Sequence, residues 1–523
     1  MYFKLLQKVA NFIDKKMHGY SILYKGWRPF HSETSYNLNG THCLPIVLNI
    51  IEFNLSSPTL KCEKVALIKS ISGIRGTLGG KPGSNLTPPD IVKFTAAFAA
   101  FLSSGKSGKK IIIGRDGRMS GELVSNLCAN TLIAYGFDVV DLGITTTPTV
   151  ELAVMQEGAA GGIILTASHN PQEWNALKLL NKHGEFINAE DGKKVLDLAE
   201  KDELNFAPVD KLGKYTKDES YLQKHIDAVA NYALVDVVAI KKAKFKIVVD
   251  AINSSGAIYI PALLRVLGVK DVIVLNGEVN GKFEHNPEPL PAHLTGLSNE
   301  VKKQNASFGI AVDPDVDRLC FVCEDGSMFG EEYTLVAVAD YVLSHRKGNT
   351  VSNLSSTKAL KEITQKHGGE YFPSAVGEVN VVNKMKEVNA VIGGEGNGGI
   401  IVPDFHYGRD ALIGIGLFLT QLANSHKSVK KLRGTYPDYF ISKNKIALEN
   451  GVDVRGVINR LKDKYRSYPI NTEDGLKIEF DKDWVHLRPS NTEPIIRIYS
   501  ESNFETTAEN IAKKIMQDIH EAM

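Results

Sequence analysis

Three short apolar runs, each followed at once by a polar loop, constrain the fold of this chain most strongly. The runs cover residues 161–165, 308–312 and 390–392, and each has the length and composition of a buried strand. Other strand patterns alternate with helical ones around them: strands at 111–114, 139–142, 245–250 and 272–275, and a helix from Pro88 to Ser103 with Thr87 as its N-cap. Such alternation predicts an α/β fold, which binds ligands in loops at the carboxyl ends of its strands.

The first of these loops is Thr166-Ala167-Ser168-His169-Asn170-Pro171. It presents a hydroxyl, an imidazole and an amide at the end of a buried strand. Pro171 supplies no N–H group and biases Asn170 away from helical geometry, so the loop is held open. An ordinary polar turn is the alternative, because Ser and Asn are common in turns.

The second loop is Asp313-Pro314-Asp315-Val316-Asp317-Arg318. Alternate residues of an extended segment point the same way, so Asp313, Asp315 and Asp317 are expected to share one side. Three close carboxylates repel one another unless a cation lies among them, and oxygen ligands of this kind suit Mg²⁺. A solvated acidic turn is the alternative. A calcium-binding EF-hand loop is excluded, because Arg318 stands where that loop needs glycine.

The third and fourth loops are Gly394-Glu395-Gly396-Asn397-Gly398-Gly399 and the segment 488–494. In the third loop, Glu395 and Asn397 are spaced to hydrogen-bond hydroxyl groups on one side. The fourth loop combines a guanidinium, hydroxyls and an amide around prolines, which predicts an anion-binding site. Its candidate ligand-binding residues are Arg488, Ser490, Asn491, Thr492 and Arg497.

Together the four loops resemble the signature loops of the α-D-phosphohexomutases, a family that includes phosphoglucomutase, phosphomannomutase and phosphoglucosamine mutase. TASHNP, DPDVDR, GEGNGG and RPSNTEP occur in the family's order and at its approximate spacing, from about Ala66 to the C-terminus. The resemblance implies three similar mixed α/β domains and a smaller C-terminal α+β domain around a central cleft. The expected boundaries are 66–212, 213–327, 328–435 and 436–523, with residues 1–65 as an N-terminal extension outside the catalytic fold. The polar segment from Lys211 to Glu219 is expected to be a linker.

The resemblance also assigns roles to residues. Ser168 would carry a phosphoryl group, donate it to a hexose phosphate and recover the other phosphate from a bisphosphate intermediate. Asp313, Asp315 and Asp317 would hold Mg²⁺ with a phosphoserine oxygen as a further ligand. His169, Lys178 and Arg75 would act with Ser168 in catalysis. Lys178 is expected to transfer a proton and therefore to have a lowered pKa. Arg115 and Arg318 are expected to face the site and contact substrate.

The sequence departs from the family at Gly399, where many members have His. His406 and Lys384 are the candidates to replace that histidine. The double glycine of this loop resembles archaeal-like phosphoglucosamine mutases, and this resemblance implies glucosamine phosphate as the substrate, with mannose and glucose phosphates as alternatives. A metal-dependent sugar phosphatase or a non-catalytic sugar-phosphate-binding protein would be a different class. A serine hydrolase is disfavoured, because G-x-S-x-G is absent around Ser168 and the adjacent His169 cannot easily pair with it as a base.

Composition narrows the remaining possibilities. The 523 residues are 43% hydrophobic and carry a formal net charge of +1, which gives no sign of a nucleic-acid partner. Five cysteines fit a reducing, cytoplasmic compartment. Cys320 and Cys323 are expected to be core residues of a strand. No apolar run is long enough to span a membrane. A monomer or homodimer acting on a small hexose phosphate is expected.

Overall fold

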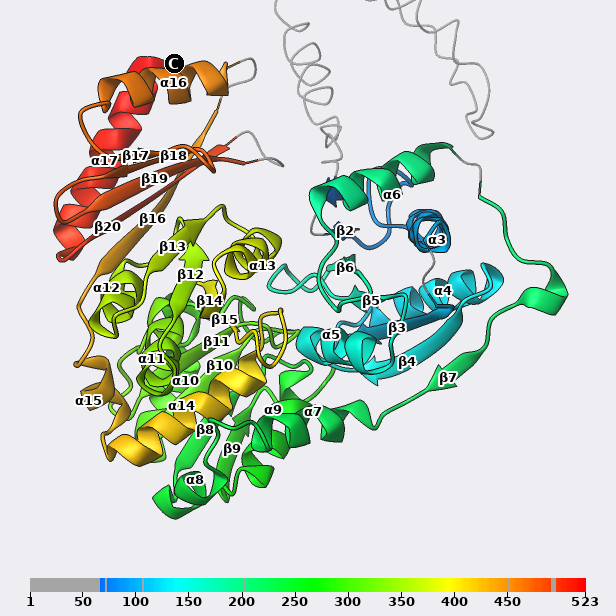
Figure 1. Cartoon of the computed structure of the whole chain (residues 1–523), viewed down its shortest axis with the longest axis horizontal. Coiled ribbons are helices and arrows are strands. Elements are labelled where there is room, and N and C mark those ends of the chain that lie inside the picture. Colours follow the sequence, from blue (N-terminus) through cyan, green and yellow to red (C-terminus); the bar gives the residue numbers. More distant parts are fainter. Residues whose placement is uncertain (1–65, 71–72, 106–107, 202–203, 449–451, 491–494) are drawn as a thin grey trace, which may run out of the picture. The chain divides into compact units, whose positions relative to one another are not determined.

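The computed structural model describes residues 66–70, 73–105, 108–201, 204–448, 452–490 and 495–523. The predicted extension, residues 1–65, lies outside this part of the chain, as do Asn491 and Thr492. The described residues form four sheets, each with its own helices (Figure 1).

The first sheet has seven strands in the order β1-β2-β6-β5-β3-β4-β7. Strand β3 lies near its centre because Ile111, Ile112 and Ile113 are all fully buried. Ile111 and Ile113 pack with helices α3, α4 and α6, while Ile112 packs with α5 on the other face. The predicted helix 88–103 and its N-cap Thr87 are confirmed. The elements are β1 (Ile68–Ser70), β2 (Gly73–Thr77), α3 (Pro88–Ser103), β3 (Lys110–Arg115), α4 (Gly121–Ala134), β4 (Asp138–Ile144), α5 (Thr147–Gln156), β5 (Gly161–Leu165), β6 (Trp174–Leu180), α6 (Ala189–Lys201) and β7 (Tyr215–Lys217).

The segment expected to be a linker is partly a strand. Tyr215–Lys217 forms β7, which pairs in parallel with β4 at the edge of the first sheet. All three side chains of β7 are exposed, so its polar sequence gave no burial pattern. The linker prediction is therefore wrong for these residues.

The second and third sheets have four strands each, in the orders β11-β10-β8-β9 and β13-β12-β14-β15. In each sheet one antiparallel strand joins an otherwise parallel set. Phe321 of β11 stacks on Phe418 of α14 at 3.8 Å between ring centroids, within a core that both sheets share. Cys320 and Cys323 are buried in β11, as expected of core residues. The elements are α7 (Tyr221–Ala230), α8 (Val237–Ala243), β8 (Lys246–Asp250), α9 (Gly256–Val266), β9 (Asp271–Leu275), α10 (Thr295–Lys303), β10 (Phe308–Val312), β11 (Leu319–Cys323), α11 (Glu331–His345), β12 (Asn349–Asn353), α12 (Ala359–Lys366), β13 (Tyr371–Ser374), α13 (Glu378–Glu387), β14 (Ala390–Glu395), β15 (Gly399–Ile401), α14 (Ala411–Ser425) and α15 (Val429–Arg433).

The fourth sheet is antiparallel throughout, in the order β16-β20-β19-β18-β17. Helices α16 and α17 pack on it through their apolar stripes (Figure 1). The elements are β16 (Phe440–Ala447), α16 (Val454–Lys464), β17 (Ile470–Asn471), β18 (Leu476–Glu479), β19 (Trp484–Pro489), β20 (Ile495–Ser502) and α17 (Glu505–Ala522). The predicted fold class, three mixed α/β domains and a C-terminal α+β domain, is confirmed. Among the helices described, none combines the length and apolar character needed to cross a membrane.

Candidate active site

Ser168 lies in the turn that follows the buried strand β5, with a left-handed backbone φ of +48°. Its Oγ donates to Oδ2 of Asp313 at 2.7 Å, which joins the first domain to the second. The same Oγ lies 3.3 Å from Nδ1 of His169. We expected adjacent residues not to meet in this way, but the left-handed turn brings the two side chains together. Asp313, not His169, makes the shorter contact with the hydroxyl.

Arg118 holds the serine loop, a role that the sequence did not indicate. Its two terminal nitrogens donate to four backbone carbonyls of the loop, and its Nε donates to Asp116 Oδ2 at 3.0 Å. The carbonyls belong to Ser168, Asn170, Pro171 and Trp174, at 2.5–2.9 Å. Arg118 is 1% exposed, so it acts as an internal support for the loop.

Arg115, which was expected to face the site, lies elsewhere. It lines a second cavity with residues of α4, β4 and β7, and its Nη1 donates to the carbonyl of Asp116. Three residues further along, Arg118 makes the contacts with the serine loop. We therefore leave Arg115 out of the site.

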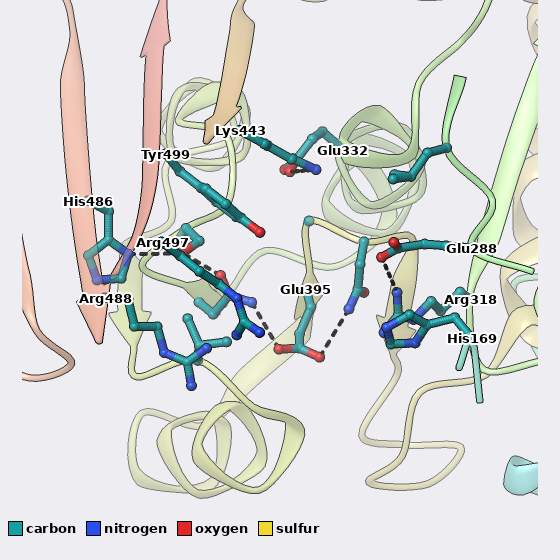
Figure 2. A pocket seen from close by; sticks show the side chains of 16 residues that line it. His169, Glu288, Arg318, Glu332, Glu395, Lys443, His486, Arg488, Arg497 and Tyr499 are labelled. Carbon is teal, nitrogen blue, oxygen red and sulfur yellow. Dashed lines mark hydrogen bonds and ion pairs between the residues drawn. The ribbon is translucent and has the colours of Figure 1, made fainter. Parts of the chain in front are cut away.

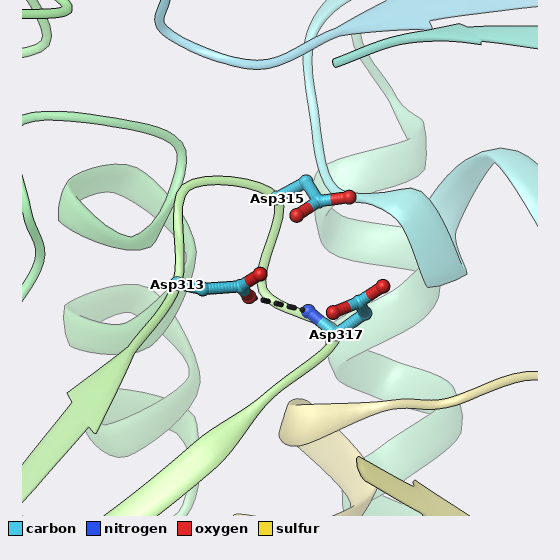
Figure 3. Close-up of side chains that lie close together, drawn as sticks. All are labelled: Asp313, Asp315 and Asp317. Carbon is cyan, nitrogen blue, oxygen red and sulfur yellow. Dashed lines mark hydrogen bonds between the residues drawn. The ribbon is translucent and has the colours of Figure 1, made fainter. Parts of the chain in front are cut away.

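The three aspartates converge in the loop between β10 and β11 (Figure 3). One oxygen from each of Asp313, Asp315 and Asp317 lies within 4.8 Å of the other two, and none of the three residues is more than 1% exposed. The turn places Val316 at a φ of +61°, which points its side chain into the core and the aspartates to one side. The backbone N–H of Asp317 donates to Asp313 Oδ1 at 3.2 Å.

The carboxylates and Lys178 perturb one another strongly. Burial and the other two aspartates raise the pKa of Asp313 well above its usual range. Burial would also raise the pKa of Asp315, but the Lys178 ammonium, 2.7 Å from Asp315 Oδ2, lowers it. Burial lowers the pKa of Lys178, yet Asp315 and Asp317 outweigh burial and raise it. The prediction of a lowered pKa for Lys178 is therefore wrong for this arrangement of carboxylates.

A cavity of about 470 Å³ opens beside the serine loop (Figure 2). All four domains contribute to its wall, which agrees with the predicted central cleft. Six of the predicted site residues line it: His169, Arg318, Glu395, Asn397, Arg488 and Arg497. The sequence did not indicate several others, among them Glu288, Glu332, Asn353, Lys443, His486 and Tyr499.

The described lining of this cavity carries both signs of charge: the cations are Arg318, Lys443, Arg488 and Arg497, and the carboxylates are Glu288, Glu332 and Glu395. Arg318 binds Glu288 at 2.9 Å, and Arg488 binds Asp474 at 2.8 Å. Burial, with the positive charges of Arg318 and Arg497, lowers the pKa of Arg75. Burial and the nearby arginines also hold the pKa of His169 well below its usual range. The guanidinium groups among these residues can bind an anionic group such as a phosphate.

The fourth loop is described only in part. Pro489 ends β19, and the backbone N–H of Ser490 donates to the carbonyl of Ile495 at 2.9 Å. Arg488 and Arg497 are directly paired across β19 and β20, which places both guanidinium groups at one end of the C-terminal sheet.

In the third loop, Glu395 is 4% exposed and fixed by several donors. Asn353 Nδ2 donates to its Oε1 at 2.9 Å, and Arg409 Nη1 donates to its Oε2 at 2.8 Å. Gly398 has a φ of +84°, and a Cβ there would lie 2.1 Å from the carbonyl oxygen of Leu319. The close approach of the two loops therefore requires glycine at this position.

Arg409 connects the aspartate loop (313–318) with the third loop (394–399) and was not found from the sequence. Its Nη2 donates to Asp317 Oδ2 at 2.6 Å and its Nε to Glu378 Oε2 at 2.9 Å, besides its bond to Glu395. Neither candidate for the missing histidine lines the cavity. Lys384 pairs with Glu387 on the surface of α13, and His406 is buried behind Arg409.

Comparisons with known proteins match this architecture domain by domain. The sequence profiles described as phosphoglucomutase/phosphomannomutase α/β/α domains I, II and III match residues 67–206, 223–326 and 330–439. The profile of the C-terminal domain matches residues 441–518. The same residues carry the four sheets described above.

Curated relatives extend over nearly all of the matched region. A phosphoglucomutase/phosphomannomutase of Thermococcus kodakarensis is 35% identical over 455 residues, 86% of this chain and 98% of the relative. A probable phosphoglucosamine mutase of Methanopyrus kandleri is 32% identical, over 84% of this chain and 95% of the relative. A phosphoglucosamine/phosphogalactosamine mutase of Sulfurisphaera tokodaii is 31% identical, over 85% and 97%.

Solved structures show the same fold. A phosphoglucomutase/phosphomannomutase family protein of Burkholderia thailandensis has a TM-score of 0.75 at 24% identity, covering 88% of this chain and 97% of the other. Aspergillus fumigatus N-acetylphosphoglucosamine mutase, in complex with GlcNAc-6P and magnesium, has a TM-score of 0.53 at 14% identity, covering 90% and 99%. With the profiles matching four consecutive domains and the signature loops meeting at one cavity, the chain belongs to the phosphoglucomutase/phosphomannomutase family and is a phosphohexomutase.

Proposed function

We propose that Ser168 is the phosphoryl carrier of this phosphohexomutase and that glucosamine phosphate is its preferred substrate. One observation carries the first part: the Ser168 hydroxyl touches a buried carboxylate of the aspartate cluster, beside a cavity lined with arginines. A phosphoserine carries a charge of about −1.5 to −2 at neutral pH. It would need a cation between itself and Asp313, Asp315 and Asp317.

The aspartate cluster fits Mg²⁺ as that cation. Its donors are carboxylate oxygens, the ligands that this ion prefers. Oδ1 of Asp315 and Oδ1 of Asp317 are buried without a hydrogen-bond partner among the described residues, which is costly unless a ligand satisfies them. Mg²⁺ held by Asp313, Asp315 and Asp317 would neutralise negative charge on the phosphoryl group during transfer.

Ser168 and Lys178 then have separate proposed roles in the reaction, as phosphoryl carrier and as proton acceptor. In the forward step the bond between phosphorus and Ser168 Oγ breaks, and a bond between phosphorus and a sugar hydroxyl oxygen forms. Lys178 is proposed to accept the hydroxyl proton. The charges of Asp315 and Asp317 raise the pKa of Lys178, and a cation bound by these two residues would offset those charges. Burial would then lower the pKa of Lys178, as a proton acceptor requires. In the second step Ser168 Oγ, left negatively charged by the first, forms a bond to the phosphorus of the other phosphate, the bond from that phosphorus to the sugar oxygen breaks, and Lys178 returns its proton to this oxygen.

Glu395 and Asn397 are proposed to orient the sugar between two anion sites. Arg488 and Arg497, with Ser490, Asn491 and Thr492, would hold the phosphate that is not reacting. His169, Arg318 and Arg75 would face the phosphoryl group at Ser168. The roles of Arg488 and Arg318 are supported by their place at opposite ends of the cavity wall (Figure 2).

The preference for glucosamine phosphate is supported by the double glycine of the third loop and by the names of two relatives. The relative at 35% identity carries the name phosphoglucomutase/phosphomannomutase, so glucose and mannose phosphates are the competing substrates. Measuring kcat/KM on the 1-phosphates of glucosamine, glucose and mannose decides between them. A lower value for the glucosamine compound than for either other sugar would refute this preference.

The carrier role is tested on purified protein by phosphopeptide mapping and a mutase assay. We expect a phosphoryl group on Ser168 in part of the population, and Ser168→Ala should lose both that group and nearly all mutase activity. Net release of inorganic phosphate instead of sugar-phosphate isomerisation would indicate a phosphatase. A phosphoryl group found only on another residue would refute the assignment.

A further inference from the structure

A buried group of ionisable side chains lies behind the site and is not used in the reaction proposed above. Glu151 of α5, His225 of α7, and His406 and Asp410 just before α14 are each at most 3% exposed. They come from three different parts of the chain. Ionisable side chains are rarely this deeply buried unless they are paired.

The hydrogen bonds of Asp410 determine that His225 and His406 each carry a proton on Nε2. Asp410 Oδ1 accepts from the backbone N–H of Leu412 at 2.7 Å, as the N-cap of α14. Its Oδ2 lies 3.0 Å from Nε2 of His225 and 3.1 Å from Nε2 of His406. An ionised carboxylate only accepts hydrogen bonds, so each imidazole must donate from Nε2.

The other ring nitrogens then differ in their partners. His225 Nδ1 lies 2.8 Å from the hydroxyl of Thr149, which can donate to it. His406 Nδ1 lies 3.3 Å from Glu151 Oε2, an ion-pair distance, and neither this nitrogen nor either Glu151 oxygen makes a hydrogen bond to the described residues. Two lone pairs facing each other would repel, so a proton must lie between His406 and Glu151. Burial raises the pKa of Glu151, and Asp410 and Glu151 outweigh burial and raise the pKa of His406, so the pair keeps that proton.

This pair lies against the backbone that carries Arg409. A Cβ at Gly408 would lie 1.8 Å from Glu151 Oε2, so the carboxyl group packs directly on the backbone of the preceding residue. On the other side, the N–H of Asp410 donates to the carbonyl of Ile400 at 2.8 Å. The backbone on both sides of Arg409 is therefore fixed, at Gly408 by packing on Glu151 and at Asp410 by the hydrogen bond to Ile400. The Arg409 guanidinium donates to Asp317 and Glu395.

We propose that Glu151 and His406 are positioning residues that share one proton and, together with Asp410, set the position of Arg409 between the aspartate loop and the third loop. Glu151 belongs to the first domain, while His406, Asp410 and Arg409 belong to the third. The contact therefore aligns the domain that carries Ser168 with the loop that binds sugar. The inference rests on the roles proposed for Asp317 in metal binding and Glu395 in sugar binding.

Three further carboxylates act on the Glu151–His406 pair. Asp410 faces His406, and Glu378 and Asp317 are the further carboxylates whose charge acts on Glu151. Both of those carboxylates are bound by Arg409 itself. A change at Glu151 is therefore expected to reach the site through Arg409.

The test compares Glu151→Leu with Glu151→Gln in the full-length protein. Leu removes the hydrogen-bonding partner of His406 Nδ1, while the Gln amide can donate to a neutral imidazole and restores the pairing. We expect Glu151→Leu to weaken Mg²⁺ binding, measured by calorimetry without sugar, by about 10- to 100-fold, as for an outer-shell residue. It should also raise KM for sugar phosphate. Glu151→Gln should stay within about threefold of the wild type in both quantities, because its hydrogen bond is retained.

The matched control is Thr364→Val. Thr364, in α12 of the third domain that also carries His406 and Arg409, makes a buried hydrogen bond to Thr350 at 2.6 Å and does not line the cavity. It should lower thermal stability and leave Mg²⁺ binding and KM unchanged.

The inference is overturned if folded Glu151→Leu binds Mg²⁺ and sugar phosphate like the wild type, or if Glu151→Gln is as impaired as Glu151→Leu. If Glu151→Leu gives no folded protein, Glu151→Gln decides alone, and more than a threefold change overturns the inference. Failure of wild-type protein to bind Mg²⁺ would instead refute the proposed metal role.

Discussion

At the scale of single residues, Lys178 and a bound metal ion would compete for the same carboxylates. Lys178 Nζ lies 2.7 Å from Asp315 Oδ2 and 3.6 Å from Asp317 Oδ2. Removing the charge of Asp315 therefore weakens a metal ligand and at the same time releases the lysine. The two effects can be separated because only the first depends on the concentration of Mg²⁺.

We expect Asp315→Asn to weaken Mg²⁺ binding by about 100-fold or more. Mutation of residues outside the first ligand shell already lowers metal affinity by about 10- to 100-fold. Activity should disappear in a chelating buffer for the wild type and return on addition of Mg²⁺. Titration of activity and calorimetry with Mg²⁺ both measure the change. Asp271→Asn, on the exposed end of β9, is the control and should behave as the wild type. Full activity of the wild type in metal-free buffer would contradict the proposal.

The aspartates could be predicted from the sequence because their chemistry and their spacing lie within six consecutive residues. Arg409 and Arg118 could not, because each acts on partners far away in the chain. Arg409 binds Asp317, 92 positions earlier, and Arg118 binds carbonyls 50 to 56 positions later. A single arginine in a turn gives no periodic or local signal of such a contact.

At the scale of secondary-structure elements, burial decided which predictions succeeded. β5 and β10 are buried along their whole length, so their apolar runs marked both strands and the loops that follow them. β7 has three exposed residues and pairs only at the edge of its sheet, so its polar sequence indicated a linker. Edge strands of this kind lack the hydrophobic pattern on which sequence interpretation depends.

The serine loop offers a test at this scale. Arg118 supports it through four carbonyls and is itself paired with the fully buried Asp116. Arg118→Met should lower the free energy of unfolding by about 3–5 kcal/mol, because it leaves a buried charge and several carbonyls without partners. Urea denaturation measures the loss, and mutase activity should fall with it. Arg265→Met, at an exposed position in α9, should change stability by less than about 0.5 kcal/mol. Equal stability of the two variants would mean that the loop does not depend on Arg118.

At the scale of the whole catalytic unit, the proposed mechanism requires the cavity to bind its substrate in two orientations. In that mechanism the phosphate that is not reacting is first at one end of the sugar and later at the other, while Ser168 stays in place. Sequence motifs identified residues of both proposed anion sites, but not Lys443, Glu332 or Tyr499, which line the wall between them. Those three come from the third and fourth domains and meet only through the packing of those domains, which no local pattern records.

Arg488 should therefore act on both orientations alike. A guanidinium can bind phosphate through two parallel N–H groups, whereas an ammonium keeps the charge but loses the fork. We expect Arg488→Ala to raise KM for sugar phosphate by about 10- to 150-fold, the equivalent of a charged hydrogen bond of roughly 1.5–3 kcal/mol, in both reaction directions. Arg488→Lys should give a smaller increase of the same kind.

Arg455→Ala, on the exposed side of α16 in the same domain, is the control and should leave KM unchanged. Phosphorylation of Ser168 should persist in all three variants, because that serine is supported by Arg118 and Asp313 and not by the C-terminal domain. Loss of the phosphoserine in Arg488→Ala with an unchanged KM would show that the two anion sites are not divided between the domains in this way.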